Sequence, residues 1–230
     1  MRLHRYYISD EFKLKHDFWI HDRGLLNQWN KVLRYRSGQD VVLFDGVDKE
    51  RLYRIIELKE DEAHLSLVTD FERQLPSKEL YLFWSLLKKN KNDWVIQKAT
   101  ELGVSHFVPL LADRTEKSGF DIDRARKIII EATEQCGRSD VPNIREPMQV
   151  ATVISSMSDK LPILVCDQGG NVPEVASASS LGILVGPEGG WSDTEKGLFD
   201  EYNIPKLGLG QFTLRAETAS IAASTLLMAD

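Results

Sequence analysis

The chain has 230 residues, of which 42% are hydrophobic and 28% charged, and its formal net charge is −6. This composition is typical of a globular protein with one large or two modest domains, and it argues against a surface that is positive all round. No apolar run approaches the roughly 20 residues that a membrane helix needs. The first residues lack the apolar core of a secretory signal, so we expect a cytoplasmic protein.

The first part of the chain alternates short β-type runs with turns. We predict strands at residues 4–8, 40–46, 51–58 and 63–71, an all-β pattern that ends before a linker around Pro76. Residues 1–36 contain eight Lys or Arg against four Asp or Glu, a net of +4, whereas residues 139–230 contain five against twelve, a net of −7. A basic N-terminal face is typical of a nucleic-acid contact, although an ordinary solvated surface explains it equally well. We therefore predict a small β domain over residues 1–74.

The second part of the chain, residues 75–230, alternates strands with helices. The pattern predicts strands at 79–88, 105–111, 162–167, 181–186 and 205–210, and helices at 91–102, 121–136 and from near residues 150, 172, 192 and 215. This order favours an α/β domain with a mostly parallel sheet. Ligands are then expected at the carboxyl ends of the strands.

Two glycine-bearing turns follow predicted strands. The segment Leu184–Glu195 joins a strand to a helix start with Ser192 and Glu195 at capping-box spacing, and Leu207–Ser220 repeats the strand, turn and helix. Glycines let backbone amides approach a ligand closely. Neither a P-loop nor a G-x-G-x-x-G pattern is present, so phosphate binding is weakly supported. A tight turn without a ligand would explain one such loop, but two can converge on one pocket.

Five blocks of this sequence together resemble one protein family. They are LVGPEGGWSDTE (184–195), LGLGQFTLRAETAS (207–220), DWVIQKATELGVSHFVPL (93–110), EATEQCGRSDVP (131–142) and KVLRYRSGQDVVLFDG (31–46). In their order along the chain, these blocks are similar to those of the RsmE family of SPOUT methyltransferases, which methylates a uridine of small-subunit ribosomal RNA. The resemblance implies a trefoil-knotted parallel-sheet α/β domain preceded by a PUA-like RNA-binding β-barrel. It also implies S-adenosylmethionine as cofactor, a homodimer, and 16S ribosomal RNA or the small ribosomal subunit as partner.

The resemblance also implies site residues. Cofactor contacts fall on Leu184, Gly186, Pro187, Glu188, Gly189, Gly190, Leu207, Gly208, Leu209, Gly210, Leu214 and Thr218. The acceptor atom is N3 of a uracil, whose proton must leave before the nitrogen can attack. A guanidinium stays protonated and can only stabilise the resulting anion, a role that falls to Arg138 and Arg215. Glu217 is the leading candidate for the base.

RNA contacts are implied for two groups of side chains. Backbone contacts fall on Arg2, His4, Arg5, Arg34 and Arg36 in the first domain and on Lys88, Lys89 and Lys91 in the second. Phe212 and Trp191 are candidates for stacking on a splayed base, with packing as the alternative for each. The chain departs from the family pattern at Leu209, Gly210 and Gln211, where a proline and an arginine are usual, and at Gln28 and Trp29, where a histidine often stands upstream.

Other interpretations keep some of these features. A SPOUT enzyme that methylates a ribose 2′-oxygen would share the fold and cofactor. A non-catalytic RNA-binding protein or a nucleotide-binding oxidoreductase would use the glycine loops differently. Cys136 and Cys166 lie far apart and are expected to be packed thiols rather than a disulfide, zinc ligands or a nucleophile, and the five histidines show no ligand spacing, so we expect no metal.

Overall fold

The chain folds into two compact units. The computed structural model describes residues 3–9, 14–88, 90–116, 119–171, 173 and 177–229. The first unit comprises Met1–Leu75 together with Thr133–Val141, and the second comprises Pro76–Ala132 and Pro142–Asp230. The chain therefore leaves the first unit between Leu75 and Pro76 but returns to it once. The predicted ranges 1–74 and 75–230 do not include that return.

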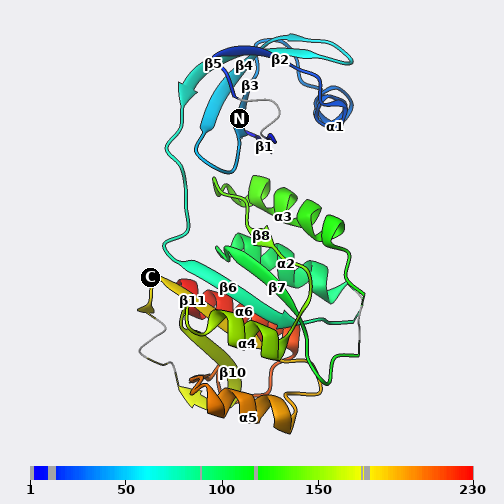
Figure 1. Cartoon of the computed structure of the whole chain (residues 1–230). Helices are drawn as coiled ribbons and strands as arrows, with labels where there is room; N and C mark the ends of the chain where they lie inside the picture. The colour runs from blue at the N-terminus through cyan, green and yellow to red at the C-terminus, as the bar shows by residue number, and fades with distance from the viewer. Residues whose placement is uncertain are drawn as a thin grey trace. The chain divides into compact units, whose positions relative to one another are not determined.

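The first unit contains a five-stranded sheet in the order β1-β3-β4-β5-β2 (Figure 1). Its strands are β1 (Arg5–Tyr7), β2 (Asp17–Ile20), β3 (Asp40–Phe44), β4 (Glu50–Leu58) and β5 (Ala63–Asp70). Neighbouring strands are antiparallel except for β1, which pairs parallel with β3. Four of the five strands match predicted runs. The sequence pattern missed β2 and the helical segment that follows it, α1 (Arg23–Asn27) and the π-helical turn η2 (Gln28–Val32).

A separate apolar core stabilises the first unit. Alternate residues of its strands face inward, as Val41, Leu43 and Ile55 do, because successive side chains of a strand point to opposite faces. The helical segment covers this core with Trp29, which is fully buried and makes an edge contact with the ring of Tyr6 at 5.5 Å. Packing of Trp29, rather than helical periodicity, explains why this short segment is ordered.

The returning segment Thr133–Val141 is tied into the first unit by polar contacts. Arg5 forms an ion pair with Glu50 at 2.5 Å, and the carboxylate of Glu50 is almost completely buried. The hydroxyl of Ser139 donates to the same carboxylate, and the backbone N–H of Tyr7 donates to Glu134 at 2.8 Å. A buried carboxylate needs such partners, so Ser139 is part of the structure of the β domain.

The second unit is built on a parallel sheet in the order β12-β10-β11-β6-β7-β8, with β9 also paired to β7. Every pairing in this sheet is parallel. The strands are β6 (Glu79–Ser85), β7 (His106–Leu111), β8 (Asn143–Ile144), β9 (Met148–Gln149), β10 (Ile163–Asn171), β11 (Ser180–Val185) and β12 (Lys206–Leu207). The two-residue strands β8 and β9 were not predicted, and the helix predicted near residue 172 falls mostly outside the described residues.

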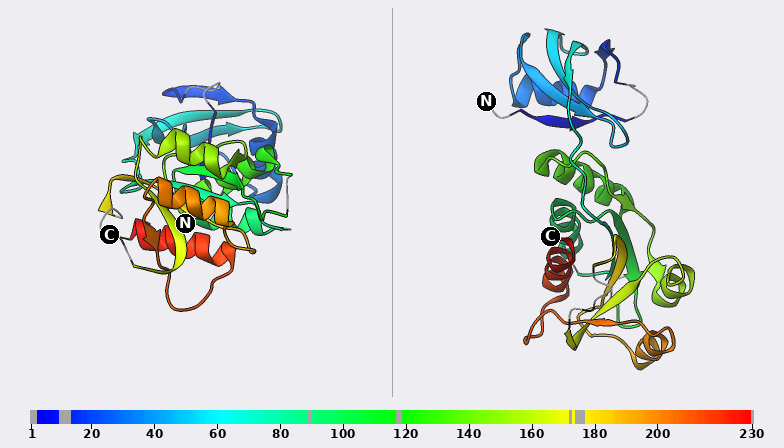
Figure 2. Two further views of the ribbon diagram at one scale, coloured as in Figure 1. Left: turned by 60° about the horizontal axis from the view of Figure 1, so that its bottom comes forward. Right: turned by 90° about the vertical axis from the view of Figure 1, so that its left-hand side faces the viewer.

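Helices cover both faces of this sheet (Figure 2). Helices α2 (Lys91–Glu101) and α6 (Ala216–Met228) pack side by side on one face, and α4 (Val150–Met157) and α5 (Asp193–Glu201) lie on the other. Apolar side chains of the sheet, among them Phe83, Val108 and Leu184, join residues of α4 and α5 in one buried cluster. Helix α3 (Ile122–Cys136) leads the chain back to the first unit, because the returning segment begins at Thr133 within its last turn. No helix in the described part of the chain has the length and apolar character that a membrane crossing requires.

The end of β10 and the turn after β12 touch at a backbone contact between two glycines, called the crossing below. β10 and β12 pair in parallel, and the backbone N–H of Gly208 donates to the carbonyl of Asn171 at 3.2 Å. A Cβ atom on Gly208 would lie 1.8 Å from the carbonyl oxygen of Gly170, so only glycine fits this crossing.

Candidate active site

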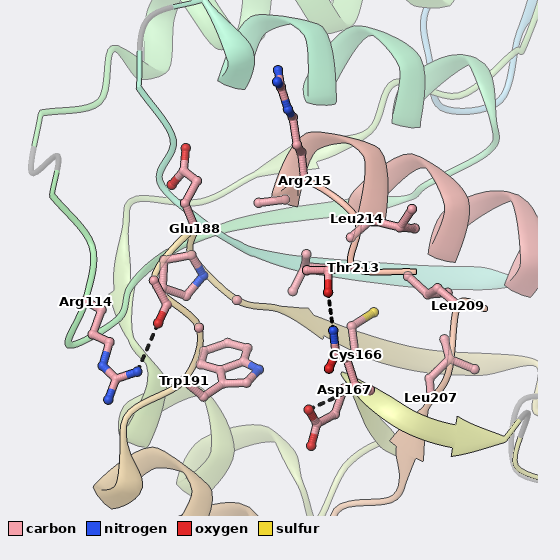
Figure 3. A pocket seen from close by; sticks show the side chains of 18 of the residues that line it. Arg114, Cys166, Asp167, Glu188, Trp191, Leu207, Leu209, Thr213, Leu214 and Arg215 are labelled. Carbon is pink, nitrogen blue, oxygen red and sulfur yellow. Dashed lines mark hydrogen bonds between the residues drawn. The ribbon is translucent and has the colours of Figure 1, made fainter. Parts of the chain in front are cut away.

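The two glycine loops converge on one pocket, which lies at the carboxyl ends of β11 and β12 and beside the middle of β10 (Figure 3). Its volume is about 580 Å³, within the range of small-molecule sites. Residues 166–168, 185–191, 207, 209–210, 212–216 and 219 line it, together with Arg114 and Lys196. The position agrees with the expectation for an α/β sheet, where ligands bind beyond the ends of the strands.

The first loop is held in shape by its own glycines. Gly190 has a φ of +68°, a conformation that other residues rarely adopt. A Cβ on Gly186 would lie 2.9 Å from the ring of Trp191, so this position has no room for a side chain. Helix α5 then starts with the predicted capping box, in which Ser192 and Glu195 each accept the other's backbone N–H.

A brace from the end of β7 supports the same loop. The guanidinium of Arg114 donates to the carbonyl of Gly189 at 2.9 Å, as drawn in Figure 3. The backbone N–H of Asp113 donates to the buried carboxylate of Glu195 at 3.0 Å, and the hydroxyl of Ser192 donates to Asp113. Arg114 was not predicted as a site residue. Its one sequence signal is its place directly after a predicted strand, where ligand-binding residues gather.

The second loop supplies apolar walls and a backbone turn. Leu207, Leu209 and Leu214 line the pocket, and the side chain of Gln168 in β10 donates a hydrogen bond to the hydroxyl of Thr213. Gly210 has a φ of +116°, in the region that glycine adopts without strain. The turn that departs from the family pattern thus has a backbone conformation that its glycine can adopt without strain.

Two acidic residues of the loops share one lysine. Lys91, the first residue of α2, lies 3.4 Å from Glu188 and 3.1 Å from Glu217. Glu217 is 8% exposed, and its buried Oε2 atom has no partner of hydrogen-bond geometry, so the charge of Lys91 is its stabilising contact. The family resemblance predicts that Lys91 contacts the RNA backbone. The structure shows it joining the two loops that form the pocket.

The two arginines expected to act together belong to different units, Arg138 to the first and Arg215 to the second. Arg215 is exposed, caps α6 and lines the pocket, where its side chain extends on the same side as Glu188 (Figure 3). Arg138 is 7% exposed, forms two hydrogen bonds with Asp140 at 2.9 and 2.6 Å, and is not among the residues that line the pocket. The guanidinium of Arg138 is paired with a carboxylate, whereas that of Arg215 has no acidic partner among the described residues.

Most of the implied cofactor residues lie at the pocket. Nine of the twelve line it, namely Gly186, Pro187, Glu188, Gly189, Gly190, Leu207, Leu209, Gly210 and Leu214. Leu184 is instead buried in the core, Gly208 forms the loop crossing, and Thr218 is an exposed residue of α6. Leu184 is needed in the core and Gly208 at the crossing, whereas Thr218 lies on α6 next to Ala219, which does line the pocket.

The two aromatic candidates differ in exposure. Trp191 is 5% exposed and packs edge-on against Phe199 at 5.0 Å. Phe212 is 74% exposed and lines the pocket. Trp191 is therefore a packing residue, whereas the exposed ring of Phe212 is not accounted for by packing.

The implied RNA-backbone residues also divide into groups. Arg2 and Lys89 lie outside the described residues. Arg5 pairs with the buried Glu50, and Lys88 pairs with Glu116. His4, Arg34 and Arg36 are exposed on the first unit, and Arg34 has a φ of +53°.

Neither cysteine is suited to act as a nucleophile at this pocket. Cys166 lines it, but burial, helped by the charge of Asp167, raises the pKa of its thiol to about 12. A thiol with this pKa stays protonated at neutral pH and is a poor nucleophile. The expectation that both cysteines are packed is corrected for Cys136, which is exposed at the end of α3. Within the described ranges, no group of three or more His, Cys, Asp or Glu side chains could hold a metal ion.

Comparison with protein families gives two matches along the chain. An RNA methyltransferase domain model matches residues 73–228, and an RNA methyltransferase PUA domain model matches residues 31–68. A relative from Rickettsia conorii, named Ribosomal RNA small subunit methyltransferase E, is 27% identical over 97% of this chain and 94% of its own. A relative of the same name from Bacillus subtilis is 29% identical over 84% of this chain and 82% of its own. These relatives confirm the resemblance to the RsmE family.

Solved structures share the fold over the whole chain. A methyltransferase of Legionella pneumophila, in complex with bound S-adenosylmethionine, is 27% identical with a TM-score of 0.87 and covers 100% of this chain and 98% of its own. A Ribosomal RNA small subunit methyltransferase E from Neisseria gonorrhoeae, bound to S-adenosylmethionine, is 24% identical with a TM-score of 0.86, covering 98% of this chain and 97% of its own. The predicted fold class is confirmed.

Proposed function

Because the chain belongs to the RNA methyltransferase family, whose domain model covers residues 73–228, we propose that it methylates N3 of a uridine in 16S ribosomal RNA, with S-adenosylmethionine as methyl donor. The observation that carries this proposal is the pocket where the two glycine loops meet, at the carboxyl ends of β11 and β12 and beside β10. Relatives named for small-subunit RNA methylation support the choice of RNA.

The lining of the pocket fits S-adenosylmethionine. This molecule presents an adenine, a ribose, a methionine group and a sulfonium, and its sulfonium supplies an electrophilic methyl group. Gly186 and Gly190 expose backbone to the pocket, Leu207, Leu209 and Leu214 give it apolar walls, and Glu188 brings a negative charge. A volume of about 580 Å³ leaves room for a molecule of this size.

Arg215 and Glu217 are the residues we assign to the reaction. Loss of the N3 proton spreads negative charge onto the uracil carbonyl oxygens, and the exposed guanidinium of Arg215 at the pocket stabilises that charge. Glu217 does not itself line the pocket, but it follows the lining residues Arg215 and Ala216 and lies 3.1 Å from Lys91, and we assign it as the group that accepts the proton. Positioning N3 in line with the methyl group supplies the rest of the rate enhancement. No covalent intermediate is needed, in agreement with the protonated thiol of Cys166.

The assembly that acts on RNA is also part of the proposal. We propose a homodimer in which exposed apolar residues of the second unit, such as Trp94 of α2 and Leu226 of α6, are covered by a second copy. The first unit, part of which matches the PUA domain model, contacts the RNA backbone through His4, Arg34 and Arg36. The protein then acts in ribosome biogenesis in the cytoplasm, where small subunits are assembled.

A labelling experiment tests the reaction. The protein is incubated with methyl-labelled S-adenosylmethionine and unmodified small subunits, the RNA is digested, and the labelled nucleoside is identified by mass spectrometry. We expect 3-methyluridine. Label on a ribose 2′-oxygen would replace the proposed acceptor, and absence of label on subunits and on free RNA would reject an enzyme.

A substitution tests the role of Arg215. Arg215→Ala is expected to reduce turnover by about 100-fold, the effect typical of losing one anion-stabilising donor, and to leave RNA affinity within a few-fold. Arg126→Ala, which removes an exposed arginine of α3 paired with Asp123, is the matched control. Equal losses of turnover and RNA affinity would place Arg215 on the docking surface instead.

A further inference from the structure

The charges that line the pocket are unevenly paired. The two acidic residues of the lining are matched by lysines outside it, Asp167 by Lys206 at 2.9 Å and Glu188 by Lys91 at 3.4 Å. The three cationic residues of the lining are Arg114, Lys196 and Arg215. None of the three has an acidic partner within 4.0 Å in the part of the chain that the structure describes. Positive charge at the pocket is therefore left for a ligand to balance.

S-adenosylmethionine does not account for this charge. It carries a sulfonium and an ammonium group against one carboxylate, and it has no phosphate. An RNA strand carries one negative charge on each nucleotide and needs cations along its path. Arg114 is suited to this role because its guanidinium has five N–H donors and the loop brace to Gly189 uses one of them.

An exposed aromatic ring lies on the same pocket. Phe212 is the most exposed large hydrophobic residue in the described part of the chain, although it sits in a loop whose leucines are turned toward the pocket. No ring contact is found for it among the described residues, in contrast to Trp191. Open aromatic faces next to cations are how proteins hold unpaired bases, with the base on the ring and the phosphates on the cations.

We propose that Arg114, Lys196 and Phe212 form a docking site for a single-stranded segment of the substrate RNA at the mouth of the pocket. Arg114 and Lys196 contact phosphates next to the target uridine, and Phe212 stacks on a base. Arg215 is left for the reacting uracil. This inference rests on the proposed function, because it assigns how the RNA enters the same pocket.

The salt dependence of binding tests the two cations. A dye-labelled, uridine-containing single-stranded RNA is titrated with the full chain at several NaCl concentrations, and binding is followed by fluorescence anisotropy. The slope of log K against log salt is negative, and Arg114→Gln and Lys196→Gln are each expected to make it less steep by about 0.7, the value for one phosphate of a single strand. Lys160→Gln, which changes an exposed lysine beyond α4 that does not line the pocket, should leave the slope unchanged.

The ring is tested by a pair of substitutions. Phe212→Ala is expected to weaken RNA binding between about 5-fold and about 150-fold with the salt slope unchanged, and Phe212→Tyr should restore binding, because stacking needs only the aromatic face. Calorimetric binding of S-adenosylmethionine is measured in Lys196→Gln and in both Phe212 variants, because these residues line the same pocket. A loss of cofactor affinity as large as the loss of RNA affinity would place them in the cofactor site instead of on the RNA. Lys196→Gln also keeps the test valid if loss of the Gly189 brace disturbs the Arg114 variant.

Several results would overturn the inference. If Arg114→Gln and Lys196→Gln had the same salt slope as Lys160→Gln, or if the unchanged chain did not bind the RNA, these two cations would not contact RNA. A Phe212→Ala variant with normal RNA affinity and a changed mass in light scattering would place the ring against a second copy of the chain. Failure of the proposed function is distinguishable: the variants would then alter RNA binding as expected while the unchanged protein produced no 3-methyluridine.

Discussion

The crossing of Gly170 and Gly208 predicts a large effect from one added methyl group. In Gly208→Ala the new Cβ would lie 1.8 Å from the carbonyl oxygen of Gly170, and real Cβ atoms essentially never come closer than 3.0 Å. The two segments must therefore separate by about 1.2 Å, the difference between these distances. Both contacting groups are backbone, so no side-chain rotation relieves the clash.

The expected loss of stability is about 3 kcal/mol, the upper end of what overpacking costs, because β10 and β12 are hydrogen-bonded at this point. With a urea dependence of about 2 kcal/mol per M, the unfolding midpoint should fall by about 1.5 M. Affinity for S-adenosylmethionine should fall as well, since Gln168, Leu207 and Leu209 on these loops line the pocket.

The assay is urea unfolding followed by circular dichroism, with calorimetry for the cofactor. Gly197→Ala is the matched control, because Gly197 is an exposed residue of α5 with no atom within 4 Å of an added Cβ. Alanine in a helix is favoured over glycine by roughly 0.5–1 kcal/mol, so this control should raise the midpoint. A Gly208→Ala protein with an unchanged midpoint and unchanged cofactor affinity would refute the crossing.

Three further outcomes follow from the described contacts. In Glu195→Gln one of the two oxygens that accept a backbone N–H becomes an NH₂ donor facing that N–H, so the free energy of unfolding should fall by about 2 kcal/mol and Tm by roughly 6 °C in calorimetry. Thr194→Ala in the same turn is the control. An equal Tm for both variants would contradict the hydrogen bonds of Glu195 to Asp113 and Ser192. A hydrogen bond from His106 holds the pKa of Glu79 below its usual range. The stability that this hydrogen bond contributes is fully present above about pH 4.3, the pKa of Glu in an unfolded chain, and is lost as the pH falls through the lowered pKa of Glu79. The difference in urea midpoint between the unchanged chain and Glu79→Gln should therefore shrink toward zero on acidification. A difference that stays constant with pH would argue against this hydrogen bond. Iodoacetamide at neutral pH should modify the exposed Cys136 and spare Cys166, whose pKa is raised to about 12, as read by peptide mass spectrometry; modification of Cys166 at a comparable rate would contradict its burial.

Sequence patterns predicted the elements whose signals are local. β6 and β11 are unbroken apolar runs between punctuating residues, and helix α5 starts at a capping box that is visible in the sequence. β2 has four residues and α1 five, too short for periodicity to emerge, and their order comes from tertiary packing. β10 continues to Asn171 through polar residues because β12 pairs with it there.

The site was predictable where it depends on strand, turn and helix in succession. Both glycine loops have that order, so their convergence could be anticipated. Arg114 and Lys196 reach the pocket from the end of β7 and from α5, and in the sequence each looks like an ordinary surface charge. Lys91 looks the same, yet it contacts two carboxylates that lie about a hundred residues or more away in the sequence. Such partners appear only once the chain is folded.

The return of Thr133–Val141 to the first unit bears on the order in which the chain is made. A ribosome releases Arg5, Glu50 and the whole five-stranded sheet before it has synthesised Ser139, whose hydroxyl completes the contacts of the buried Glu50. The N-terminal β domain therefore finishes its folding only after Pro76–Ala132 of the second unit has emerged. Its maturation is tied to that of the methyltransferase domain, and a fragment cut after Leu75 would carry a carboxylate that lacks one of its partners.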